Sequence, residues 1–240
     1  MTVTIHWTYA VLHLGLSIWH RDLFQKRGQH PWMLGLLVNT IALVYDNLIL
    51  GMGSWIGVGS VLANLSVLRF AFHALFTPSL LWTGLYIANH GRPTWAMSRQ
   101  THRVVGIIVL VLIVVGIQES LLDYQAYPVC QQDGLVRYTQ TRIHPEIVCD
   151  GIAYPVLGVG NSTANAAIGT CLILILMGLH VALVSGNGWL LLGSLLMCAA
   201  AAADVRAPTV WLGNGGEVVL VTSMTMAMRE FAVKLPATLD

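Results

Sequence analysis

Four ionisable side chains interrupt long apolar runs of the sequence, and they are the first candidates for chemistry: Asp46, Arg69, His73 and Glu217. An ionisable group inside a membrane is costly and by default indicates a functional site. A carboxyl group that stays protonated there can act as a general acid, and an imidazole can act as a base. Asn47 directly follows Asp46 and could orient it.

Ser66, Arg69 and His73 are spaced by three and four residues, which places them on one face of a predicted helix. Arginine stays charged in proteins, so an anion should meet Arg69. We expect Asp46, Glu217 or an anionic substrate group in that role. At 1.5 Å per residue, Asp46 is about eight residues and Arg69 about fifteen residues from the outer surface. A direct pair therefore requires helix tilt or a long reach of the arginine.

Glu217 follows Asn214 and two glycines, at about ten residues from the outer face and close to the depth of Asp46. Two carboxyl groups at one depth would share a proton, and the protonated one could act as an acid. The glycines allow a backbone or a ligand to approach closely. Two alternatives stay open: Asp46 is only the partner of an arginine, and Glu217 lies in a helix-packing patch.

Metal and cofactor motifs are absent from the sequence: it has no HExxH, CxxC or GxSxG. No lysine lies in a predicted span, which excludes a retinal Schiff base. His13, His73 and His180 lie within spans, so haem ligation by two of them stays an alternative, as does zinc held by Asp46, His73 and His180. We predict no metal and no cofactor.

The composition indicates a membrane protein. Of the 240 residues, 56% are hydrophobic and 10% are charged, and the net charge is +1. The mean hydropathy is +0.70. Soluble domains are about 45–50% apolar and about 25% charged. These values exclude a soluble enzyme, a disordered protein and a nucleic-acid-binding protein.

A bilayer span needs about 20 mostly apolar residues, and seven segments fit. They predict an all-α polytopic helix bundle in a single transmembrane domain of residues 1–240. Ser79–Asn89 follows Pro78 and is short, so we interpret it as a re-entrant or interfacial piece, with an eighth span as the alternative. The seven segments are Thr4–Trp19, Trp32–Gly53, Trp55–Phe76, Val104–Leu121, Ala164–Val184, Trp189–Ala203 and Thr209–Met228.

The positive-inside rule favours seven spans with the N-terminus outside. The polar loop Leu122–Thr163 (residues 122–163) then lies on the extracytoplasmic or lumenal side. Cys130 and Cys149 lie in this loop, and a disulfide between them suits an oxidising compartment. Two free thiols are the alternative. The basic residues placed inside are Arg21, Lys26, Arg27, Arg92, Arg99, Arg103, Arg229 and Lys234.

In size, topology and buried acids, the whole chain resembles the small integral-membrane terpene cyclases of fungal meroterpenoid pathways. The resemblance implies that buried carboxyl groups protonate a terminal olefin or epoxide of an isoprenoid substrate, and Asp46 and Glu217 are then the acids. The chain lacks the early Trp-Glu pair of the better-known branch, and its outer loop is larger than that family leads us to expect. Aromatic faces for a passing cation would come from Tyr45, Trp55, Phe72, Trp82 and Trp211.

We therefore predict a multi-pass enzyme of the endoplasmic reticulum or a bacterial inner membrane. It would cyclise or isomerise a hydrophobic isoprenoid or lipid, with membrane lipids as its surroundings and no nucleic-acid partner. Asp46, Glu217 and His73 are the predicted catalytic residues. Asn47, Ser66, Arg69 and Asn214 are assigned to substrate binding. The alternatives are a small transporter or channel that uses the same polar stripe, an intramembrane lipid hydrolase, and a structural membrane subunit.

Overall fold

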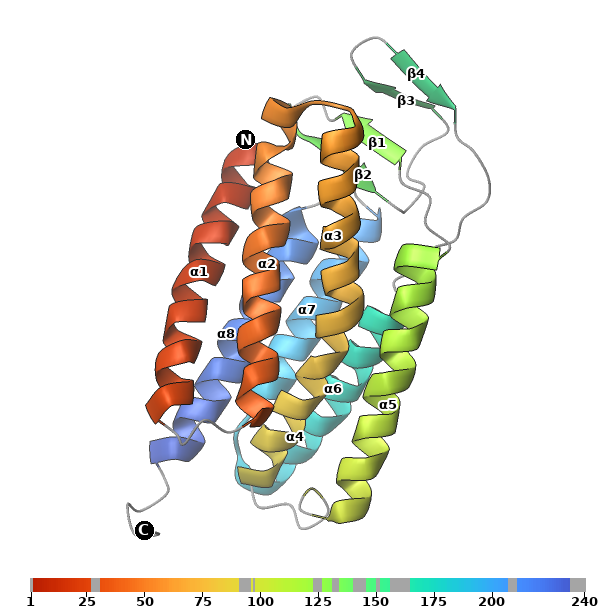
Figure 1. Cartoon of the computed structure of the whole chain (residues 1–240). Coiled ribbons are helices and arrows are strands. Elements are labelled where there is room, and N and C mark those ends of the chain that lie inside the picture. Colours follow the sequence, from red (N-terminus) through yellow and green to blue (C-terminus); the bar gives the residue numbers. More distant parts are fainter. Residues whose placement is uncertain are drawn as a thin grey trace.

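The computed structural model describes residues 2–26, 31–90, 96, 98–122, 127–130, 134–139, 146–149, 152–155, 165–206 and 211–233. These residues form a bundle of long α-helices with two small hairpins at one end (Figure 1). The predicted helix bundle is thus confirmed. Its helices are α1 (Thr2–Lys26), α2 (Pro31–Ile56), α3 (Ser60–Phe76), α4 (Leu80–His90), α5 (Arg99–Ile117), α6 (Asn165–Ser185), α7 (Trp189–Arg206) and α8 (Trp211–Val233).

Pro78 interrupts one rod and does not separate two membrane segments. A three-residue turn, η1 (Thr77–Ser79), joins α3 to α4, and the two helices continue each other down the bundle (Figure 1). Together they form a helical segment of 31 residues, Ser60–His90. Ser79–Asn89 therefore continues the rod of α3 and does not turn back, which differs from the re-entrant interpretation, and the number of spans stays a prediction. A tight turn tolerates the missing N–H and fixed φ of proline, so the helix can resume after it.

Among the described residues, four helical segments are long and apolar enough to cross a membrane: Met33–Ile56, Ser60–His90, Arg99–Leu122 and Asn165–Ser185. Trp189–Ala203 in α7 is apolar but shorter. Large apolar side chains point outward, and Leu183 on α6 is 77% exposed. Exposed apolar surface of this kind is compatible with lipid contact. The described residues of the predicted spans Thr4–Trp19 and Thr209–Met228 lie in α1 and α8, which are not among these four segments.

Small residues bring the helices on the α6–α8 side close together. A methyl group on Gly178 of α6 would lie 2.5 Å from the backbone nitrogen of Leu191 on α7. A methyl group on Gly216 of α8 would lie 2.8 Å from Cβ of Ala200 on α7. Small residues at such crossings are typical of helix association in membranes.

The predicted polar loop contains two antiparallel hairpins, which the all-α prediction did not include. Strand β1 (Tyr127–Cys130) pairs with β2 (Val136–Thr139), and β3 (Glu146–Cys149) pairs with β4 (Ile152–Pro155). The β1–β2 hairpin covers the end of the bundle near the N-terminus (Figure 1). The N-terminus and the loop thus lie at the same end of the bundle. The predicted topology, with both on one side of the membrane, requires this arrangement.

Gly53 is the position on which this hairpin rests. A methyl group there would lie only 1.8 Å from the carbonyl oxygen of Val136 on β2, so the side chain of any other residue would displace the strand. Leu135, at 0% exposure, packs with Leu50 of α2 and Val3 of α1. Apolar packing therefore holds this part of the hairpin against α1 and α2.

Cys130 and Cys149 are the last residues of β1 and β3. The side chain of Cys149 lies outside the described residues, so their disulfide stays a prediction. Cys171 on α6 and Cys198 on α7 are free thiols whose sulfur atoms lie 2.9 Å apart.

Candidate functional site

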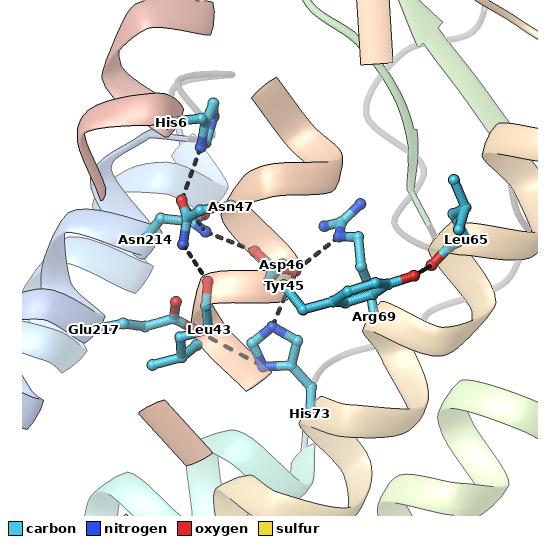
Figure 2. Close-up of polar contacts among 10 residues, drawn as sticks. All are labelled: His6, Leu43, Tyr45, Asp46, Asn47, Leu65, Arg69, His73, Asn214 and Glu217. Atoms are coloured by element: carbon cyan, nitrogen blue, oxygen red, sulfur yellow. Dashed lines mark hydrogen bonds and ion pairs between the residues drawn. The ribbon is translucent and has the colours of Figure 1, made fainter. Parts of the chain in front are cut away.

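Asp46 of α2 lies at the centre of a buried polar cluster. Arg69 of α3 donates from Nε to Asp46 Oδ1 at 2.7 Å, and Asn214 of α8 donates from Nδ2 to Asp46 Oδ2 at 2.8 Å. His73 Nε2 lies 3.3 Å from Oδ1 (Figure 2). Asp46 is 2% exposed and Arg69 is 7% exposed. With donors on both oxygens, this carboxyl group is held as an anion that orients its neighbours.

The direct pair between Asp46 and Arg69 shows that counting residues placed the two too far apart in depth. The expected separation assumed straight helices perpendicular to the membrane. Helix tilt and the long arginine side chain remove the expected difference in depth, because the guanidinium extends along its own helix toward the preceding turns. Breaking a buried pair of this kind by removing one partner typically costs about 3–5 kcal/mol.

His73 stands between the two carboxyl groups. Its Nε2 faces Asp46, and its Nδ1 lies 3.9 Å from Oε1 of Glu217 on α8 (Figure 2). We predicted two carboxyl groups that share a proton directly. The structure instead inserts an imidazole, which can take a proton at one nitrogen and release one from the other. Glu217 and His73 are more exposed than Asp46, with side-chain exposures of 18%, 34% and 3%.

A small cavity of about 60 Å³ reaches this cluster. Glu217 and His73 form one polar part of its wall. Most of the remaining wall is apolar. The lining residues are Asn39, Leu43, His73, Thr77, Leu80, Ala167, Thr170, Cys171, Leu174, Met197, Glu217, Leu220 and Val221.

The residues assigned to substrate binding lie behind the cavity wall and do not line it. Asn47 accepts from Asn214 at 3.2 Å, contacts the His6 ring at 3.1 Å and donates to the carbonyl of Leu43. Ser66 is fully buried, and its hydroxyl has no hydrogen-bond partner among the described residues. Asn47 and Asn214 therefore join α1, α2 and α8 around Asp46 (Figure 2).

The five proposed aromatic faces do not line the larger cavity either. Trp55 is 74% exposed, and Tyr45 donates its hydroxyl to the carbonyl of Leu65. Phe72 packs edge-to-face on Tyr45 at 5.3 Å and lines a smaller, narrow pocket beside His73. Of the five, only Phe72 lies against a described pocket near the site.

Sequence analysis missed a row of three histidines on α1. His6, His13 and His20 recur every seven residues, and each is at most 2% exposed. His20 contacts the hydroxyls of Thr225 on α8 at 2.5 Å and Thr40 on α2 at 3.2 Å. The seven-residue spacing was visible in the sequence. However, of these three histidines only His13 was considered, as a candidate haem ligand.

No group of three or more His, Cys, Asp or Glu side chains within the described part of the chain could hold a metal ion. The zinc alternative on Asp46, His73 and His180 is therefore not formed. Asp46 is instead satisfied by Arg69 and Asn214.

Comparisons of the chain with protein-family models, curated proteins and solved structures find no match. Its function therefore has to be inferred from the geometry of the site.

Proposed function

We propose that this protein is a membrane enzyme that uses Glu217 and His73 for acid–base chemistry on an apolar, isoprenoid-like substrate. One observation carries the proposal: both side chains line an otherwise largely apolar cavity, and they lie 3.9 Å apart. The cavity would widen to admit a hydrocarbon chain, whose reactive olefin or epoxide would lie at the polar wall. This agrees with the reaction that the resemblance to membrane terpene cyclases implies.

Glu217 is the better proton donor of the two carboxyl groups. Asp46 already accepts from Arg69 and Asn214, so protonating it would break a buried ion pair. Glu217 faces the cavity, where its carboxyl proton can be transferred to a substrate double bond or epoxide oxygen. Asp46 acts as a positioning residue that holds the His73 ring in place, much as a carboxylate orients a catalytic imidazole.

The proposed reaction conserves atoms and electrons. The Glu217 carboxyl O–H bond breaks. In an olefin, the π bond breaks as the proton forms a new C–H bond; in an epoxide, the proton binds the oxygen and one ring C–O bond breaks to leave a hydroxyl group. Either way the substrate becomes a carbocation. Ring closure forms a carbon–carbon bond at the cationic centre from a neighbouring double bond. A carbon–hydrogen bond then breaks, His73 accepts the proton, and the proton returns to the Glu217 carboxylate. The product is an isomer of the substrate, and no metal or redox partner takes part.

The remaining topological predictions belong to this proposal. A seven-span arrangement with the hairpins outside the cytoplasm would close the site from that side, and a Cys130–Cys149 disulfide would join β1 to β3. An endoplasmic reticulum membrane or a bacterial inner membrane would supply such a substrate from the lipid phase.

A transporter is the second candidate, because η1 interrupts a rod directly beside the cavity, with Thr77 and Leu80 in its wall. Broken helices often line transport sites. The glycines around Asn214 lie inside the continuous helix α8 and do not interrupt it.

The test uses purified full-length protein in lipid vesicles with a farnesyl-bearing phenol and its terminal epoxide as probes. We expect products of unchanged mass with the natural chain and at least a hundredfold slower formation with Glu217→Gln, since general acid catalysis contributes about 10²–10⁴-fold. The matched control is Glu230→Gln on the same helix, where the carboxylate accepts from Asn187 at 2.9 Å. Thermal unfolding confirms that each variant is folded.

Full turnover by Glu217→Gln would show that Glu217 is not the acid. Uptake of a probe into the vesicles without chemical change, and its loss in the same variant, would favour the transporter.

A further inference from the structure

The histidine row of α1 (His6, His13 and His20) extends from the polar cluster toward the opposite end of the bundle. Seven residues advance a helix by about 10.5 Å, so the row covers about 21 Å on one face. That face packs against α2 and α8, the two helices that carry Asp46 and Glu217. The other ionisable groups on these partner helices whose side chains are described are Tyr45 on α2 and Arg229 and Glu230 near the end of α8.

His13 is the middle member and the least satisfied. It is 0% exposed, and neither ring nitrogen has a hydrogen-bond partner among the described residues. The His6 ring contacts Asn47 through Nδ1 and leaves Nε2 without such a partner. Buried polar groups in native proteins are almost always paired with protein or with ordered water. Unpaired nitrogens along one helix face therefore indicate water between these rings.

The surroundings of His20 can accommodate both its protonated and its neutral form. The Thr40 hydroxyl lies 2.7 Å from the Leu36 carbonyl, and the Thr225 hydroxyl lies 2.7 Å from the Val221 carbonyl. When both hydroxyls donate to these carbonyls, they can only accept from His20, which then carries protons on both nitrogens. When one hydroxyl rotates and donates to the ring, His20 is neutral. The same partners thus serve both states, which differ by one proton.

The β1–β2 hairpin covers part of the other end of the bundle. It rests on Gly53, and Leu135 is fully buried between α1 and α2. Arg137 of β2 is also buried at this end. Protons that reach the cluster beside Leu135 would have to cross apolar packing. The histidine row offers polar groups from the opposite end instead.

We propose that the histidine row is a proton path, connected by water, which exchanges protons between the α1 C-terminal end of the bundle and the Asp46–His73–Glu217 cluster. Each imidazole accepts a proton from water at one nitrogen and releases the proton of the other, so no net charge is left behind. Intervals of about 10.5 Å exceed a hydrogen bond of about 3 Å, so water must lie between the rings. The assignment of the path as a proton supply for catalysis rests on the proposed function.

The test uses the full-length chain with isotope-labelled histidine nitrogens in phosphatidylcholine bilayers. Solid-state NMR measures the transfer of magnetisation from water to each ring and the rate at which the His73 ring proton exchanges with deuterated water. We expect water contact at His13 in the natural chain. His13→Leu should slow exchange at His73 at least about tenfold, because a proton-shuttling ring is lost.

Two further variants make the result decisive. His180→Leu on α6 is the matched control and should leave the exchange at His73 unchanged. His13→Gln can bind water but cannot carry a proton, so its exchange rate should lie between those of the natural chain and His13→Leu. It also carries the test if the leucine variant does not fold.

A His13 ring without water contact would overturn the path, as would equal exchange in His13→Leu and His180→Leu. These measurements need neither substrate nor turnover. Slow exchange in His13→Leu combined with full turnover in Glu217→Gln would keep the path and remove the proposed catalytic role.

Discussion

Two halves of the bundle satisfy their buried polar groups in different ways. In α6 and α7, Thr170, Ser185 and Ser194 each donate to the carbonyl four residues earlier in their own helix. In α1, α2, α3 and α8, Thr40 and Thr225 also donate to their own helices. The charged and amide side chains there bond across helices, as Arg69 and Asn214 do with Asp46. Where polar groups bond within their own helix, packing holds the neighbouring helices together. Where they bond across helices, the contacts depend on the tertiary structure, and these contacts form the site.

The largest effect should come from removing the cation of the cross-helix half. Arg69→Leu leaves the Asp46 carboxylate buried and without its ion-pair partner, so we expect a loss of about 3–5 kcal/mol in unfolding free energy. Denaturant unfolding in detergent micelles measures it. The double variant Asp46→Asn with Arg69→Leu should recover much of the loss. A single variant as stable as the natural chain would show that the pair contributes little.

A smaller effect is expected where the other half relies on close packing. Gly178→Val places a side chain against the backbone of α7 at Leu191, where a methyl group alone would lie at 2.5 Å. Overpacking of this kind costs about 1–3 kcal/mol. Gly188→Val is the control, because it has open space at its Cβ position. The midpoints of thermal unfolding compare the two variants. Equal midpoints would contradict close packing as the source of stability in this half.

The cross-helix half also contains a group that should be dispensable for folding. Ser66 is fully buried, and its hydroxyl has no partner among the described residues. Removing a buried unsatisfied hydroxyl is neutral or stabilising by up to about 1 kcal/mol. Ser66→Ala should therefore unfold at the same temperature as the natural chain or higher. A clear loss of stability would reveal a hydrogen bond that the described contacts do not contain.

The smallest effect is expected for a locally satisfied hydroxyl. Ser194→Ala on α7 removes a donor whose acceptor, the Leu190 carbonyl, belongs to the same helix. Alanine has a higher helix propensity, so the change in unfolding free energy should stay within about 0.5 kcal/mol. The same unfolding measurement applies. A loss as large as that of Arg69→Leu would erase the difference between the two halves.

Much of the fold and the membership of the site were predictable from the sequence. Long apolar runs predict the helices because the bilayer leaves few ways to satisfy backbone groups. Asp46, Arg69, His73 and Glu217 were identified because ionisable residues are rare inside such runs. The hairpins were missed because short polar strands show no strong alternation of apolar and polar residues. The break at Pro78 was misread because the length of Ser79–Asn89 alone cannot distinguish a separate helix from the continuation of the preceding one.

The sequence by itself determined which residues are apolar, which few are ionisable and which histidines repeat every seven positions. These are properties of single residues and of helix geometry, so they can be read without knowing which residues are in contact in the folded protein. Only the tertiary structure decided that Arg69 pairs with Asp46, that His73 separates the two carboxyl groups and that Glu217 faces the cavity. Tilt, rotation and side-chain reach set those contacts, and each depends on how all the helices pack together.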